Sequence, residues 1–215
     1  MQDIVIVGAG GFAREVLALI EKLNEESPKW KVLGFIDDNL HALDNYDLGY
    51  SILGTISEWT PIADEQYAMA IASPQLKEKV SGTLKERGAK FATLVHPKVS
   101  IGKRVTLGEG VILFEHTIVD IDVRLEDFVF INTFCTIGHD AVIGRCTTIA
   151  PGVGISGTCK IGQYVNMGGH SYIIPGKKVG DHAVIAAGSV VFNNVKEKTT
   201  VIGNPAKRLK AIENG

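Results

Sequence analysis

The sequence predicts an α/β domain with a small parallel sheet, followed by a parallel β-solenoid. Two observations carry this prediction. The first hundred residues alternate short apolar strands with amphipathic helices, and the second half repeats with a period of six residues. The 215 residues suffice for one domain and a smaller partner. We place the boundary between residues 1–97 and 98–215.

The composition is that of an ordinary soluble protein. Hydrophobic residues make up 45% of the chain and charged residues 21%, and the formal net charge is −2. Because nucleic-acid binders carry excess positive charge to neutralise phosphates, we expect no nucleic-acid partner. No apolar run approaches the length of a membrane span, and the N-terminus lacks a basic segment ahead of its first apolar stretch. We therefore expect a cytoplasmic protein without a membrane span.

The three cysteines are expected to be small packing residues. Cys135, Cys146 and Cys159 are odd in number and show no CxxC spacing. Neither a disulfide framework nor a zinc knuckle fits this pattern.

The first half alternates strands and helices in the order expected of a parallel sheet. Apolar runs and helical spacing predict strands at 4–7, 32–36, 67–72 and 91–95, and helices at 14–22 and 74–87. Ser73 is suited to begin the second helix.

A glycine-rich turn joins the first strand to the first helix. Gly8, Gly10 and Ala13 satisfy the fingerprint of Rossmann-like domains, in which backbone amides at a helix start receive a phosphate and an acidic residue ending the next strand holds a ribose. A tight turn needing glycine for packing explains the glycines equally well, and Asp37 and Asp38 also suit a solvated strand end. If this domain binds a ligand, its length of fewer than 100 residues suits a nucleoside diphosphate better than a nicotinamide cofactor, which needs a full dinucleotide-binding fold.

From Ile101 to Val191, every sixth residue is Ile, Leu, Val or Met. The fourth residue after each is small or Val, except Lys177, and the residue directly after it is often Gly, as a tight corner would require. A helix would need a period of 3.6, so the pattern predicts short strands joined by corners, with two inward positions in each hexad.

The glycine turn, the hexads and the final VIGNPAKRLK together resemble the PglD/NeuD-type sugar acyltransferases over essentially the whole chain. The resemblance implies a left-handed parallel β-helix with three hexads per coil, hence five coils, and a homotrimer. It also implies transfer of an acetyl group from acetyl-CoA to an amine or hydroxyl of a sugar, often one carried on a nucleotide, in bacterial glycan biosynthesis.

The family's catalytic motif matches Ile137 to Gly144, which contains His139 and Asp140. By its phase, His139 points out of the prism, where a neutral imidazole can take the proton that the acceptor loses. Asp140, or an acid acting across the interface between subunits, would raise the basicity of His139. No cysteine or serine is an obvious acyl carrier, so direct attack on the thioester is expected.

The resemblance also assigns binding residues. Gly10, Gly11 and Phe12 match the turn over the sugar nucleotide, Asp37 and Asp38 its uracil or ribose side, and Ala72 the following strand end. On the acetyl-CoA side, Gly157 matches a residue whose amide faces the thioester carbonyl, and Gly169 and Ala187 match positions lining the pantetheine channel. Thr148 matches a position near the acetyl group, where it offers a hydroxyl, and Lys207 offers a cation near the CoA phosphates.

Two positions depart from several relatives, which have histidine where this chain has Phe12 and Thr148. Because Phe12 cannot share a proton, the sequence does not determine which sugar is the acceptor, nor whether its nitrogen or its oxygen is acylated. Two alternatives stand beside the transferase: a non-catalytic trimeric scaffold or nucleotide-sugar sensor, and a zinc hydrolase resembling the hexapeptide carbonic anhydrases. The latter needs paired histidines that this chain lacks, so no metal is expected.

Overall fold

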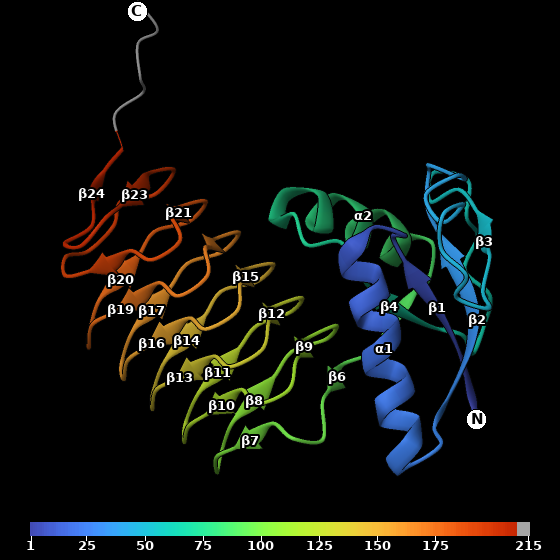
Figure 1. The fold of residues 1–215 in the computed structure, drawn as a ribbon, viewed down its shortest axis with the longest axis horizontal. Coiled ribbons are helices and arrows are strands. Elements are labelled where there is room, and N and C mark those ends of the chain that lie inside the picture. Colours follow the sequence, from blue (N-terminus) through green and yellow to red (C-terminus); the bar gives the residue numbers. More distant parts are fainter. Residues whose placement is uncertain (210–215) are drawn as a thin grey trace, which may run out of the picture.

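The computed structural model describes residues 1–209, as an α/β domain beside a β-solenoid (Figure 1). The first domain holds a parallel sheet of order β3-β2-β1-β4-β5. Its elements are β1 (Gln2–Val7), α1 (Gly11–Glu26), β2 (Trp30–Ile36), β3 (Ile52–Gly54), β4 (Gln66–Met69), α2 (Pro74–Glu86) and β5 (Lys90–Phe91). The alternation predicted from the sequence is confirmed, with β3 as an additional edge strand.

The single strand expected at 91–95 is in fact two. β5 pairs with β4 in the first domain, whereas β6 (Leu94–Val95) pairs with β9 (Ile112–Leu113) in the solenoid. Ala92 donates its amide to Tyr67 O and Leu94 donates to Val111 O, so the chain changes sheets within three residues. The apolar run is continuous because both units bury it.

The solenoid has three parallel faces, defined by which strands stack on each other. The eight-stranded face contains β6, β9, β12 (Phe130–Ile131), β15 (Thr148–Ile149), β18 (Asn166–Met167), β21 (Val184–Ile185), β23 (Thr200–Ile202) and the antiparallel β24 (Lys207–Arg208). The six-stranded face contains β7 (Ser100–Ile101), β10 (Ile118–Val119), β13 (Thr136–Ile137), β16 (Gly154–Ile155), β19 (Tyr172–Ile173) and β22 (Val190–Val191). The five-stranded face contains β8 (Thr106–Leu107), β11 (Arg124–Leu125), β14 (Val142–Ile143), β17 (Lys160–Ile161) and β20 (Lys178–Val179).

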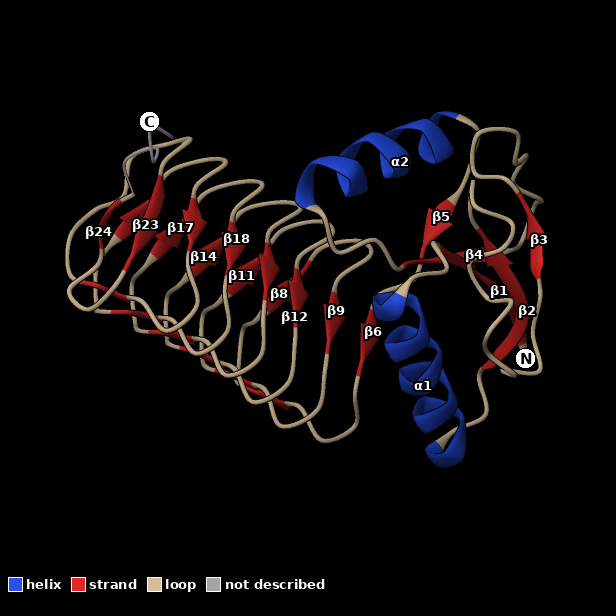
Figure 2. Ribbon diagram, turned by 45° about the horizontal axis from the view of Figure 1, so that its top comes forward, coloured by secondary structure: helices blue, strands red, loops and turns tan. Residues whose placement is uncertain are grey.

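The chain visits these faces in a fixed order, which defines three corners. The first corner leads from the eight-stranded to the six-stranded face, the second from there to the five-stranded face, and the third back to the eight-stranded face (Figure 2). Residues 18 apart therefore stack in one column, as Val119 does on Ile137. The parallel β-helix expected from the period is confirmed, and β6 and β23 extend its coils beyond the hexads that run from Ile101 to Val191.

From Val111 to Val191 both inward positions of the hexad are buried as predicted, except at Lys177, with Ile137 at 1% and Ala141 at 0% exposure as examples; in the first coil Ile101 is 42% exposed. The reason for the glycines differs from the expectation. The left-handed backbone of each corner falls on the third residue after the aliphatic, which is mostly not glycine, as at Asp140 (φ 59°) and Thr158 (φ 61°). The glycines directly after the aliphatic instead touch the next coil: a Cβ on Gly144 would lie 2.5 Å from the carbonyl carbon of Gly162.

The two units share an apolar junction. Phe114, Phe128 and Phe130 of the solenoid belong to the same buried cluster as the first domain's core, while a second cluster fills the solenoid interior. Both views show α1 beside the first coils and α2 reaching from the first domain to the solenoid (Figures 1 and 2). No helix of residues 1–209 is long and apolar enough to cross a membrane.

Candidate active site

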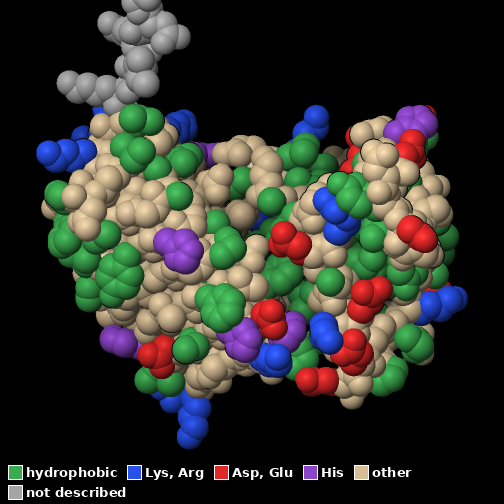
Figure 3. Space-filling model, viewed as in Figure 1, with side chains coloured by type: hydrophobic (Ala, Val, Ile, Leu, Met, Phe, Trp, Pro, Cys, Tyr) green, Lys and Arg blue, Asp and Glu red, His purple; other side chains and the backbone are tan. Residues whose placement is uncertain are grey.

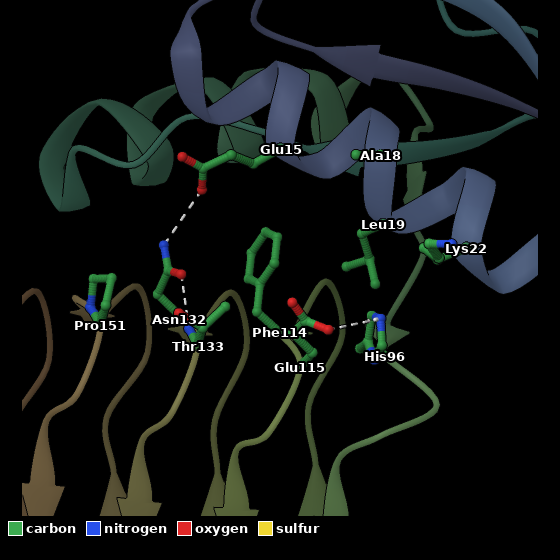
Figure 4. A pocket seen from close by; sticks show the side chains of 10 residues that line it. All are labelled: Glu15, Ala18, Leu19, Lys22, His96, Phe114, Glu115, Asn132, Thr133 and Pro151. Carbon is green, nitrogen blue, oxygen red and sulfur yellow. Dashed lines mark hydrogen bonds and ion pairs between the residues drawn. The ribbon is translucent and has the colours of Figure 1, made fainter.

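A groove of about 520 Å³ separates α1 from the first corner of the solenoid. Figure 3 shows this side of the molecule hollowed between the two units, with acidic and histidine side chains gathered around it. Its lining comes from α1 and from four successive corner turns (Figure 4): Glu15, Ala18, Leu19, Lys22, His96, Phe114, Glu115, Asn132, Thr133 and Pro151. A concave, partly apolar site with a few polar groups is typical of small-molecule binding.

Polar contacts mark both ends of this groove. Asn132 Nδ2 donates to Glu15 Oε2 at 3.4 Å, joining the solenoid to α1. At the other end, His96 Nε2 lies 3.8 Å from Glu115 Oε2, while His96 Nδ1 accepts the Lys98 amide. His96 is buried at 7% exposure, and this burial lowers its pKa.

His139 and Asp140 lie at the second corner, between β13 and β14. His139 Nδ1 is 2.8 Å from Asp140 Oδ2, and both side chains are more than half exposed. The hydrogen bond to Asp140, reinforced by its charge, raises the pKa of His139 above its ordinary value. Since Nδ1–H donates to the carboxylate, Nε2 is left with its lone pair as the acceptor of a proton.

Gly157 stacks one coil above His139 in the same column. A Cβ on Gly157 would lie 2.5 Å from His139 Nε2, so only glycine leaves the imidazole in this position. Several corner amides at the equivalent position are capped by a side chain of their own or of an adjacent coil, as Arg145 N is by Glu126 and Gln163 N by Asp181. Within residues 1–209 the Gly157 amide has no acceptor, so a hydrogen-bond donor stands beside the free imidazole nitrogen.

The glycine turn lies at the point where the strand order of the sheet reverses. β1 connects through α1 to β2 on one side, while β4 pairs with its other edge, and ligands of parallel α/β sheets bind at this point. Gly10 precedes α1 and Gly11 begins it; a Cβ on Gly10 would meet nothing within 4 Å, and one on Gly11 only Arg14. The two glycines at the start of α1 therefore border open space, as an anion bound at this helix N-terminus would require.

Asp37 and Asp38 lie at the end of β2, and their carboxylates make internal hydrogen bonds. Asp37 accepts the amides of Ala9 at 2.7 Å and Asn39 at 2.8 Å, and Asp38 accepts that of Ser57 at 2.9 Å. Asp37 thereby fixes the glycine turn. The sequence pattern identified its neighbourhood but not this contact.

Phe12 and Thr148 lie at the junction of the two units. The Phe12 ring stacks on Phe130 at 5.2 Å and tilts against Phe114 at 5.7 Å. Thr148 Oγ1 donates to Ala72 O at 2.7 Å and accepts from Lys77 Nζ at 2.9 Å. Both residues therefore help to dock the two units of this chain.

The other expected acetyl-CoA residues lie apart from His139 within one chain. Gly169 and Ala187 stack at the first corner, in the column of Thr133 and Pro151, while Gly157 and His139 are at the second corner. Lys207 is exposed on β24 at the far end of the solenoid. A site using both corners needs the second corner of one chain to face the first corner of another.

Two residues near these sites carried no sequence signal. The Arg14 guanidinium lies 3.8 Å over the Tyr46 ring beside the glycine turn, and its Nε has no partner within the described residues. Lys77 is fully buried on the face of α2 that also buries Val80 and Leu84, although lysine is ordinarily a surface residue. Within residues 1–209, no group of three His, Cys, Asp or Glu could hold a metal ion.

Comparison with known proteins identifies both units. Residues 3–84 match the model of the PglD N-terminal domain, and residues 122–157 that of the bacterial transferase hexapeptide (six repeats). Among relatives, GDP-perosamine N-acetyltransferase of Escherichia coli O157:H7 is 27% identical over 200 residues, covering 92% of this chain and 81% of that protein.

Solved structures cover almost the whole chain. WeeI from Acinetobacter baumannii AYE has a TM-score of 0.85 at 29% identity, covering 97% of this chain and all of that one. The acetyltransferase domain of PglB from Neisseria gonorrhoeae FA1090, in complex with acetyl coenzyme A, has a TM-score of 0.86 at 25% identity, covering 97% and 99%. With the exposed His139 pair, these matches define the chain as an acyltransferase built on hexapeptide repeats. Its first domain matches the PglD N-terminal domain, so the chain is similar to the PglD-type sugar acyltransferases in both of its units.

Proposed function

We propose that the protein transfers an acetyl group from acetyl-CoA to the amine or hydroxyl of a nucleotide-linked sugar, with His139 as general base. The relatives support both substrates: one is named a GDP-perosamine N-acetyltransferase, and a similar structure holds acetyl coenzyme A. The glycine turn at the switch point of the sheet suits the nucleotide, and the groove beside α1 suits the sugar.

The observation that carries the proposal is the His139, Asp140 and Gly157 cluster. His139 Nε2 takes the proton that the acceptor loses as the new bond to the acetyl carbon forms and the thioester C–S bond breaks, and CoA leaves as its thiol once the proton is returned. Asp140 holds the imidazole by Nδ1. In this proposal the Gly157 amide, one coil from His139 in the same column, donates to the carbonyl oxygen, where negative charge develops.

The proposed site lies between subunits of a homotrimer. The six-stranded face exposes Ile118 at 50% and Tyr172 at 45%, and Phe134 at the first corner is 64% exposed. Large exposed apolar side chains on one face favour burial against another copy. Such packing would bring the second corner of one chain, with His139, to the first corner and groove of its neighbour.

Thermal stabilisation and a transfer assay test this proposal together. The panel contains acetyl-CoA, CoA, NADH, zinc, and UDP-, dTDP- and GDP-linked amino and neutral sugars, GDP-perosamine among them. We expect stabilisation by acetyl-CoA and by one nucleotide sugar, and acetyl transfer between those two. Stabilisation by nucleotide sugar alone, without CoA turnover, would support the sensor instead, and stabilisation by zinc the hydrolase.

His139→Ala is the decisive variant. Loss of a general base is expected to lower kcat by about 10²- to 10⁴-fold, while the oligomer and the binding of both substrates persist. Size-exclusion chromatography with light scattering checks the assembly, and steady-state kinetics the rate. Full activity in this variant would exclude His139 as the base.

A further inference from the structure

Lys77 is a buried lysine without a carboxylate partner. It lies in the first turn of α2 with 0% exposure, at the junction of the two units. Its Nζ donates to Thr148 Oγ1 at 2.9 Å and lies 3.4 Å from the centroid of the Phe130 ring. Within residues 1–209 it forms no ion pair.

The charged groups around Lys77 do not compensate it. On its own helix, Glu78 pairs with Arg145 of the solenoid at 2.7 Å and accepts the thiol of Cys146 at 3.2 Å. Burial lowers the pKa of Lys77 well below the ordinary lysine value, against a small opposing effect of Cys146. An amine that ionises less readily in the fold than in the unfolded chain destabilises the fold at any pH where the unfolded amine is charged.

The contacts of Lys77 lead to the acceptor side of the proposed site. Thr148, which accepts from Lys77, donates to the carbonyl of Ala72. Ala72 follows the carboxyl end of β4, on the side of the sheet that carries the glycine turn. The two segments are in close contact, because a Cβ on Gly8 would lie 3.1 Å from Ile71 and 3.2 Å from the carbonyl oxygen of Ala70. The Phe130 ring beneath Lys77 also receives Phe12, the second residue of α1.

We propose that Lys77 is a positioning residue for the acceptor, which acts through Thr148 to hold Ala72 and the ligand-binding edge of the first domain against the solenoid. This inference rests on the proposed function. It explains why a destabilising side chain lies at a junction that is otherwise aromatic, since groups that weaken the fold are concentrated where function needs them. It also assigns Thr148 to the acceptor side rather than to acetyl-CoA.

Lys77→Met and Thr148→Val test the inference, with Lys79→Met as the matched control, because Lys79 is exposed on the same helix. Thermal unfolding is measured at pH 7 and pH 10, and KM is measured for acetyl-CoA and for the nucleotide sugar that stabilises the wild type, GDP-perosamine first. Calorimetric titration gives the acceptor Kd independently of turnover.

We expect Lys77→Met to raise the Tm at pH 7. Burial of Lys77 costs stability wherever the unfolded lysine is protonated, so this gain shrinks as the pH rises towards the ordinary lysine pKa. Lys77→Met and Thr148→Val each raise the acceptor KM and Kd by about three- to tenfold and leave the KM for acetyl-CoA unchanged. In the double variant the two effects on acceptor binding are not additive, because both substitutions break the same chain of contacts. Lys79→Met changes none of these values.

Three results would overturn the inference. A lower Tm for Lys77→Met at pH 7 would show that the buried amine stabilises the fold. Unchanged acceptor binding in both variants would leave Lys77 without a positioning role. A higher KM for acetyl-CoA in Thr148→Val would place Thr148 on the donor side. If the wild type binds no nucleotide sugar, the proposed function itself fails, and the pH-dependent Tm shift still reports on Lys77.

Discussion

The protonation state of His139 depends on its contact with Asp140. The Asp140 carboxylate accepts a hydrogen bond from Nδ1–H, and this bond and the negative charge stabilise the imidazolium. A general base acts in its neutral form, so kcat/KM should rise with pH through the raised pKa of His139.

Asp140→Asn should lower the pKa of His139 and move this acid limb of kcat/KM to lower pH. The plateau rate should also fall, because the amide orients the imidazole less firmly. A pH series of kcat/KM, with an NMR titration of His139, measures both effects. An acid limb at the same pH in both proteins would mean that Asp140 does not set the basicity.

Gly157 provides the room that the imidazole occupies. In Gly157→Ala the new Cβ meets Nε2 at 2.5 Å, so the ring must turn away from the reacting atoms. We expect kcat to fall by up to about a hundredfold, as misplacement by about 1 Å does elsewhere, with the oligomer intact. Gly82→Ala, where a Cβ meets nothing within 4 Å, is the control. Equal activity of the two variants would contradict this role.

At the scale of the element, the solenoid is held by close stacking of its coils. The glycines that follow the inward aliphatic residue let the backbones of neighbouring coils come into contact at the corners. The residues with left-handed backbone shape the corner but do not by themselves allow this contact. Interiors resist added methyl groups when the neighbour is backbone, since backbone cannot rotate aside.

Gly144→Ala should therefore lower the free energy of unfolding by about 1–3 kcal/mol. Gly82→Ala on α2 should instead raise it, by about 0.5–1 kcal/mol, because alanine favours the helix. Urea unfolding of both variants against the wild type measures the two changes. A neutral Gly144→Ala would show that the coils separate easily at this position.

At the scale of the whole molecule, the residues expected to act together lie at two corners of each prism. The proposed trimer predicts that neither His139→Ala nor Gly11→Glu is active alone, the latter because its carboxylate repels the ligand phosphate at the start of α1. When the two variants are coexpressed, about a quarter of the sites combine an intact His139 with an intact turn from the neighbour. Activity near that level supports a shared site, and none at all would place the site within one chain.

The sequence by itself determined the architecture of both units, because periodicity reports which side chains face inward and is a local property. The six-residue repeat predicted the solenoid, the strand and glycine turn predicted the first domain, and the phase of the repeat placed His139 outside. Only the tertiary structure decided how distant segments meet. Lys77 and Thr148 lie 71 residues apart, and Phe12 meets Phe130 only because the two units dock. Even the division of the run at 91–95 between two sheets follows from that docking, since each sheet offers its own partner strand and the apolar pattern is the same for both.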